Sequence, residues 1–141
     1  MIIEQQQPTL PALWANNMSI EGMWAAYFGD VDSRNPSANS GILVLESGRI
    51  FGGDSLMAYR GRYELDGAHV TAVAETWAYN ASHGLVTTAF GSIGNQRIDI
   101  ELDGAYFADD GVLGSIKGTV WQKAAPERKL PIHLMKLDEL P

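Results

Sequence analysis

Apolar and polar residues alternate with a period of two along most of this chain, and turn-forming dipeptides separate the alternating segments. The segments 59–66 and 97–103 alternate most regularly. Such alternation places one face of a strand against a core and the other in water. Gly adopts the positive φ of two-residue turns freely and Asp tolerates it, so the pattern predicts an antiparallel meander of hairpins. The predicted turns are Ser47-Gly48, Asp66-Gly67, Asp103-Gly104 and Asp110-Gly111.

The predicted strands number about eight, the count typical of an up-and-down barrel of lipocalin or calycin size. The links look too short for the crossovers of a β-sandwich, so the sequence favours the barrel. We expect one all-β domain, a single antiparallel barrel over residues 20–124, preceded by a loose N-terminal arm at 1–19. The tail at 125–141 is expected to add an edge strand, cover a barrel end or pack on a dimer partner. The strands are expected at 22–28, 41–45, 49–52, 59–66, 69–79, 85–91, 98–103 and 113–122, with a short candidate at 105–108 and a helical turn at 56–58.

Composition narrows the class of partner. Asp and Glu number 17 against 10 Lys and Arg, which gives a net charge of −7. Because nucleic-acid affinity rests largely on Lys and Arg that neutralise phosphates, we expect no direct nucleic-acid binding, and the charge also disfavours anionic lipid. No apolar run approaches the roughly 20 residues of a membrane span. With no cysteine and no secretory signal pattern, the expected location is the cytoplasm.

Residues that carry catalytic or metal chemistry are sparse. The chain has no cysteine nucleophile and no Gly-x-Ser-x-Gly elbow, and its three histidines are scattered without zinc-ligand spacing. We therefore expect no enzyme activity, no metal and no cofactor. The motif Gly52-Gly53-Asp54 is open to two interpretations, an anion-binding nest or a tight strand exit capped by Asp54. The absence of phosphate-loop spacing favours the structural turn.

The predicted inward face carries small residues, which leave room for a ligand inside the barrel. A barrel of about eight strands is either filled by side chains or holds one small ligand. The aromatic side chains of Tyr59, Tyr63 and Phe90 fill the same space, which slightly favours a packed core. A small apolar ligand is the alternative, and its candidate residues are Tyr59, Gly61, Tyr63, Ala72, Ala74, Phe90 and Gly118.

Three aromatic residues fall on the opposite, outward face. Trp77 and Tyr79 alternate with the inward residues of one strand, and Trp121 does so on another. Exposed aromatic side chains at strand positions are typical of protein interfaces. The sequence therefore predicts a protein-binding surface at these positions.

A specific run of motifs spans Gly22 to about Asp66. It consists of a Gly-aromatic first strand (Gly22, Trp24, Tyr27, Phe28), the run Gly-Ile-Leu-Val-Leu at 41–45, Gly-x-Ile-x-Gly-Gly-Asp at 48–54, and Tyr-x-Gly at 59–61. This stretch resembles the GrlR-type negative regulators of type III secretion. The resemblance implies a small, dimeric β-barrel without enzymatic activity, which represses by binding a transcriptional activator and keeping it from DNA. In that family an acidic run after the Tyr-x-Gly strand matters for activator binding, and here the loop carries Glu64 and Asp66.

Two functional hypotheses follow. The resemblance, the charge of −7 and the outward aromatics favour a regulatory binding module for a basic partner protein. The alternative is a carrier of a small apolar ligand inside the barrel. The expected partner-binding residues of the first hypothesis are Glu64, Asp66, Trp77, Tyr79 and Trp121.

Overall fold

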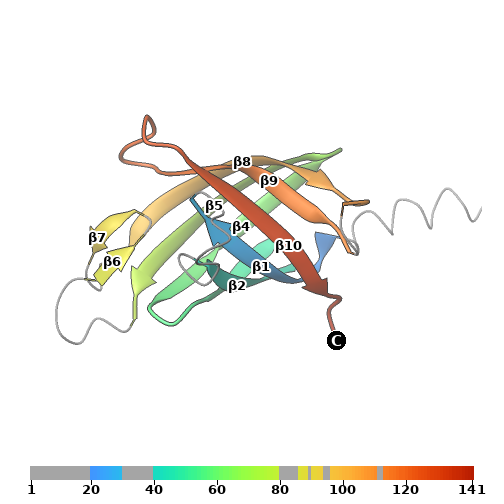
Figure 1. The fold of residues 1–141 in the computed structure, drawn as a ribbon, viewed down its shortest axis with the longest axis horizontal. Coiled ribbons are helices and arrows are strands. Elements are labelled where there is room, and N and C mark those ends of the chain that lie inside the picture. The colour runs from blue at the N-terminus through green and yellow to red at the C-terminus, as the bar shows by residue number, and fades with distance from the viewer. Residues whose placement is uncertain (1–19, 30–39, 80–85, 89, 94–95, 111–112) are drawn as a thin grey trace, which may run out of the picture.

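Eight antiparallel strands close into a barrel in the order β1-β10-β9-β8-β5-β4-β3-β2 (Figure 1). This computed structural model describes residues 20–29, 40–79, 86–88, 90–93, 96–110 and 113–141. The predicted all-β, up-and-down barrel is confirmed, whereas the arm expected at 1–19 lies outside the described residues. The barrel strands are β1 (Gly22–Phe28), β2 (Ser40–Glu46), β3 (Arg49–Gly53), β4 (Met57–Asp66), β5 (His69–Ala78), β8 (Ile98–Phe107), β9 (Ser115–Gln122) and β10 (Leu130–Asp138).

The last strand, β10, closes the barrel by pairing with both β1 and β9. Of the alternatives for the segment 125–141, the structure shows an added strand, which closes the barrel and is not an edge strand. Apolar residues on the outer face, such as Met135 and Leu137, obscure the alternation of this strand in the sequence. Near its end the Lys136 side chain is fully buried and its ammonium group pairs with Glu139 at 2.7 Å.

The hairpin turns agree only in part with the predicted ones. Ser47 and Gly48 form the β2–β3 turn as predicted, both with positive φ. The β4–β5 turn is centred one residue later than predicted, on Gly67 and Ala68, because Asp66 still pairs with His69. The turn predicted at Asp103-Gly104 is wrong, since β8 runs straight through both residues. The turn predicted at Asp110-Gly111 includes residue 111, which lies outside the described residues.

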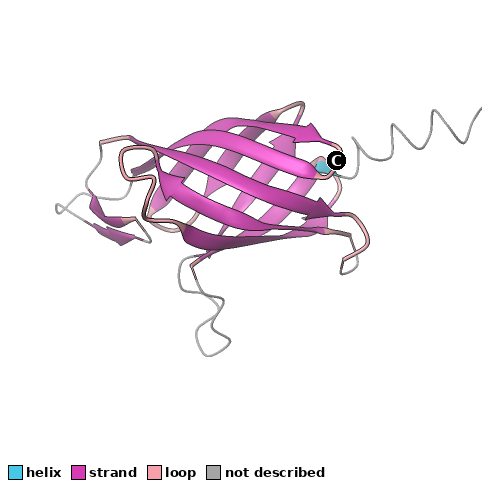
Figure 2. Cartoon of the chain, turned by 90° about the horizontal axis from the view of Figure 1, so that it is seen from above, coloured by secondary structure: helices cyan, strands magenta, loops and turns pink. Residues whose placement is uncertain are grey.

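Two further elements differ from the expectation. The segment 85–91 is not a barrel strand. Instead, β6 (Val86–Thr88) and β7 (Gly91–Ile93) form a separate two-stranded sheet beside one end of the barrel (Figures 1 and 2). The helical turn expected at 56–58 is also wrong, because β4 already begins at Met57. Sequence alternation alone did not distinguish a short hairpin from a barrel strand.

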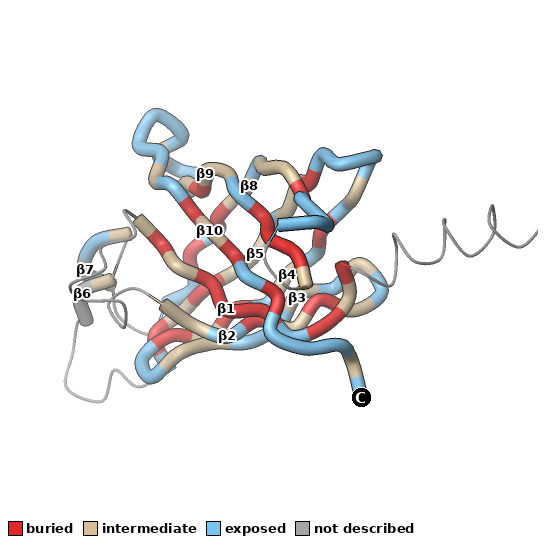
Figure 3. The backbone as a smooth tube through the Cα atoms, turned by 45° about the vertical axis from the view of Figure 1, so that its right-hand side comes forward, coloured by how far each residue is buried: buried red, intermediate tan, exposed pale blue. Residues whose placement is uncertain are grey.

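Buried and exposed positions alternate along the strands, so one face of each strand forms the core (Figure 3). The inward side chains pack in the barrel interior, and Trp24 is fully buried among them. Its indole Nε1 donates to the Ile20 carbonyl at 2.9 Å, which satisfies its polar atom. Phe28 contacts Tyr59 and Phe90, with ring centroids 5.6 and 6.2 Å apart.

The small inward residues serve close approach of the strands. A Cβ at Gly61 would lie 2.6 Å from the Ala74 Cα and even closer to the Val73 carbonyl oxygen. Between β8 and β9, a Cβ at Gly118 would lie 2.5 Å from the Gly104 Cα. These glycines therefore allow the backbones of β4 and β5, and of β8 and β9, to come together.

We predict that Gly61→Ala lowers the free energy of unfolding by about 2 kcal/mol, because the methyl group has no space against the β5 backbone. The matched control is Gly67→Asn, where no atom lies within 4 Å and φ is +62°. Asn tolerates that φ, so the control should change stability by less than about 1 kcal/mol. Urea unfolding measures both variants, and equal effects would contradict the close-approach explanation.

Candidate functional site

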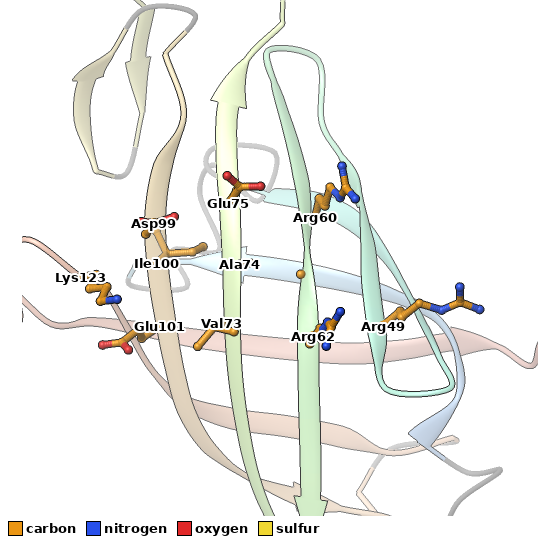
Figure 4. A pocket seen from close by; sticks show the side chains of 11 residues that line it. Arg49, Arg60, Arg62, Val73, Ala74, Glu75, Asp99, Ile100, Glu101 and Lys123 are labelled. Carbon is orange, nitrogen blue, oxygen red and sulfur yellow. The ribbon is translucent and has the colours of Figure 1, made fainter.

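A groove runs across the outer face of the barrel, with β5 as its floor and β4 and β8 as its walls (Figure 4). One section has a volume of about 620 Å³ and the next about 370 Å³. Arg62, Val73 and Glu101 line both sections, so the two are continuous. Thr71 and Val73 of β5 line the floor with short side chains, and Val73 is 54 % exposed.

On either side of Val73 the two walls of the groove differ in charge, although Lys123 adds a basic side chain on the β8 side. Arg60 and Arg62 point outward from β4, and Arg49 lies on β3, on the side of β4 that is away from β5 (Figure 4). On the opposite side, Asp99 and Glu101 point outward from β8. The strand register places Val73 directly between Arg62 and Glu101, so these two charges are separated by two strand spacings, roughly 9.6 Å.

Like charges lie directly opposite one another at two places in the groove. Arg49 pairs in register with Arg62, and Glu75 with Asp99. Like charges in this arrangement destabilise a sheet. Glu75 also lies in register opposite Arg60 and pairs with Arg97 at 3.3 Å, which offsets its repulsion from Asp99. Among the described residues, no ion pair joins Arg49 or Arg62 to a carboxylate, so the repulsion between these two arginines is not offset.

Two tryptophans of the outer face are each held by charged neighbours. The Trp121 indole Nε1 donates to Glu101 at 2.9 Å, and the Lys129 ammonium lies 3.5 Å from the centroid of that ring. On β5 the Arg97 guanidinium lies 3.8 Å from the Trp77 ring centroid and pairs with Glu75 at 3.3 Å. These contacts hold both rings in place.

The predicted partner-binding residues all lie on the outer face, but the structure divides them into two groups. Glu64 and Trp121 line the same section of the groove, with Asp66 two residues further along β4. Trp77 is six residues beyond Thr71, the register partner of Glu64, which is roughly 20 Å along β5. Tyr79 follows Trp77, and its hydroxyl donates to the Asp54 carbonyl at 2.8 Å.

The Gly52-Gly53-Asp54 motif forms a structural link between β3 and β4. Asp54 Oδ1 accepts hydrogen bonds from the backbone N–H groups of Leu56 and Met57 at 2.8 and 2.7 Å, so Asp54 caps the turn, though a strand follows it. Its Oδ2 accepts the Tyr59 hydroxyl at 2.5 Å. Burial, reinforced by this carboxylate, raises the pKa of the Tyr59 phenol far above its ordinary value.

The candidate ligand-binding residues line the interior, but little space remains between them. Tyr59, Ala72 and Ala74 border an apolar cavity of about 40 Å³. Pockets for drug-sized ligands are about 300–1,000 Å³. The backbones of the neighbouring strands fill the space beside Gly61 and Gly118, while Tyr63 and Phe90 pack on the core. Among the described residues, the interior is therefore close to filled.

The described ranges contain neither a group of metal-ligating side chains nor a helix that could span a membrane. No group of three or more His, Asp or Glu side chains there is placed to hold a metal ion. His69 instead pairs with Asp103 at 3.1 Å, and His133 lies beside the Tyr27 ring. No helix within those ranges has the length and apolar character needed to cross a membrane.

No family model matches the chain, and no curated protein matches it either.

Sequence reasoning missed the two charged walls. The alternation already placed Arg60 and Arg62 outward on one strand, and Asp99 and Glu101 outward on another. It did not indicate that β5 lies between these strands, because the small β6–β7 sheet interrupts the chain there. The missing information was therefore the pairing of β5 with β8.

We predict that Asp54→Ala lowers the free energy of unfolding by about 2 kcal/mol, because two backbone N–H groups and the buried Tyr59 hydroxyl lose their acceptor. Asp54→Asn is the matched control. Its side-chain oxygen still accepts from the backbone, so it should lose less than half as much. Thermal or urea unfolding compares them, and equal losses would contradict the capping role of Oδ1.

Proposed function

We propose that this protein is a non-enzymatic regulatory module that binds another protein through the outer-face groove. In keeping with the resemblance to GrlR-type repressors, the proposed partner is a transcriptional activator that the barrel sequesters from DNA. The proposed location is the cytoplasm, which the absence of cysteine favours.

The observation that carries the proposal is the repulsive pair Arg49–Arg62 beside an exposed apolar floor. A sheet face with no binding role gains nothing from placing Arg49 opposite Arg62 without an ion-pair partner for either. A partner with complementary charges removes this repulsion when it binds. Exposed Val73 and the held Trp121 supply the apolar and aromatic contacts that interfaces favour.

Toward the β4–β5 turn both walls of the groove are acidic, which suits a basic partner. Glu64, Glu101 and Asp103 line the section next to Trp121. Asp66 extends this acidic surface to the β4–β5 turn. Of these, Glu64 and Asp66 form no ion pair within the described part of the chain, so they are available to basic side chains.

A second face supports the proposed homodimer. Of the nine large apolar side chains that are exposed in the described residues, five lie on β10, β1, β2 and β3. The register makes them neighbours, since Ala25 pairs with both Met135 and Ile42, and Val44 with both Met23 and Phe51. An apolar face of this kind is typical of interfaces between identical subunits. The five are Met23, Ile42, Phe51, Met135 and Leu137.

The carrier hypothesis lacks a comparable observation. The interior cavity of about 40 Å³ holds no more than a very small molecule. The groove is therefore the better-supported binding site.

We predict that the double variant Glu64→Lys and Asp66→Lys loses the partner that the wild-type protein captures. The experiment is affinity capture from the native cytoplasm with quantitative mass spectrometry, followed by reconstitution with the purified partner. We expect a DNA-binding protein with a basic surface whose recovery falls at least about tenfold, since charge reversal adds repulsion at two positions.

The control for this experiment is Glu127→Lys, in the β9–β10 connection, because Glu127 does not line the groove. It should leave recovery within about twofold. Capture that both variants leave unchanged would overturn the proposed site. Capture of nothing that binds DNA would overturn the regulatory function.

We predict that Ile42→Glu combined with Phe51→Glu converts the dimer to a monomer, because two charges would be buried at the interface. Sedimentation velocity measures the mass of each species. Val73→Glu serves as the control. Val73 is also an exposed apolar residue, but it lies on β5, outside the apolar face, so this variant should leave the dimer intact. A wild-type protein that sediments as a monomer would refute the assignment of this face.

A further inference from the structure

We infer that Arg49, Arg60 and Arg62 form a binding site for a phosphoryl group, in the section of the groove that has a volume of about 620 Å³. This inference rests on the proposed function, because it names the chemistry that the basic side chains of the same groove recognise. Its basis is the repulsion between Arg49 and Arg62, which no ion pair within the described residues relieves.

The three arginines come from two neighbouring strands and share the outer face. Arg49 on β3 lies in register opposite Arg62 on β4, one strand spacing or roughly 4.8 Å away. Arg60 precedes Arg62 by two residues, so it lies on the same face, roughly 6.8 Å along the strand. All three line the same hollow (Figure 4). One anion above β4 can therefore contact guanidinium groups from both strands.

The hollow holds four cations, which exceeds its three carboxylates. The fourth cation is Lys123, and in the described part of the chain none of the four forms an ion pair. Of the carboxylates, Glu75 pairs with Arg97 and Glu101 accepts from the Trp121 indole. The charge left without a partner in this hollow is therefore mainly positive, although the whole chain carries −7.

Two carboxylates lie next to the arginines and leave them unneutralised. Glu46 is in register opposite Arg49 on β2, and Glu75 is opposite Arg60 on β5. Glu75 pairs with Arg97 instead, and no ion pair joins Glu46 to Arg49 in the described ranges. An incoming anion therefore does not have to displace an existing partner of these arginines.

Arg62 lies at the centre of the site. Its register neighbours are Arg49 on one side and the exposed Val73 on the other, so neither is an anion. An anion that bridges Arg62 and Arg49 replaces their repulsion by two charge-assisted contacts. This position gains the most from a ligand.

A phosphoryl group suits two adjacent guanidinium groups better than a carboxylate does. Arginine forms paired hydrogen bonds with two oxygens of one anion, so the two oxygens of a carboxylate satisfy one guanidinium group. A phosphoryl group offers three oxygens and close to two negative charges, enough for both. The basic residues of β3 and β4 are all arginine, the side chain suited to such bidentate recognition.

Titration of the full chain with inorganic phosphate tests the site directly. NMR spectra of the arginine Nε–Hε groups follow the titration, and sodium chloride keeps the ionic strength constant. We expect saturable shifts with a Kd of about 1 mM, as two charge-assisted contacts give at an exposed site. Acetate should bind at least about tenfold more weakly, because it serves only one guanidinium group.

Arg62→Gln should weaken phosphate binding at least about tenfold, because it removes the central guanidinium group. The variant also removes the repulsion from Arg49, so urea unfolding should find it no less stable than the wild type. The matched control is Arg128→Gln, at an exposed position of the β9–β10 connection, and it should leave the phosphate affinity within about twofold.

The phosphoryl group can belong to a side chain of the partner or to a free small molecule. Binding of the captured partner before and after phosphatase treatment distinguishes these sources. Binding that falls at least about tenfold after treatment supports a phosphorylated side chain. Binding that phosphatase leaves unchanged, together with saturable phosphate binding at Arg62, supports a free phosphorylated molecule.

The outcomes separate this inference from the proposed function. Phosphate that acts no differently from acetate or chloride, or that binds Arg62→Gln as tightly as wild-type protein, would overturn the phosphoryl site. Capture that depends on Glu64 and Asp66 would then still support the regulatory function. Capture of no DNA-binding protein would overturn the regulatory function, while saturable phosphate binding that requires Arg62 would still support the site.

Discussion

Closure of the sheet is the constraint on which the rest of the structure depends. Because β10 pairs with β1 and β9, the eight barrel strands have no free edge, and their backbone groups are committed to the ladder. Closure also brings backbones close together, and the glycines at 61, 104 and 118 make that approach possible. Among the described residues the interior is close to filled, and the larger hollows lie on the outer face.

The outer face is not uniform. One side, around β10, β1, β2 and β3, is apolar, and the other side, around β4, β5 and β8, is highly charged. In the proposed dimer, the apolar face would contact the second copy of the chain, and each subunit would still present its groove to the proposed partner.

Much of the fold follows from the sequence, while the candidate site follows only in part. The period-two pattern indicates the strands and their inward faces, and Ser47-Gly48 is a turn that local chemistry determines. Asp103-Gly104 looks the same in the sequence, but Gly104 is a glycine because the β9 backbone lies against it. The groove depends on β5 pairing with β8 across an intervening hairpin, a long-range contact that no local pattern encodes.

The Arg49–Arg62 pair of the groove has a consequence for how this surface responds to ionic strength. Salt screens the repulsion between the two arginines, so this pair destabilises the sheet less as the salt concentration rises. The same screening weakens the attraction between the groove and the proposed charged partner. In this proposal the local strain of the free groove and the affinity for the partner therefore both decrease as ionic strength rises.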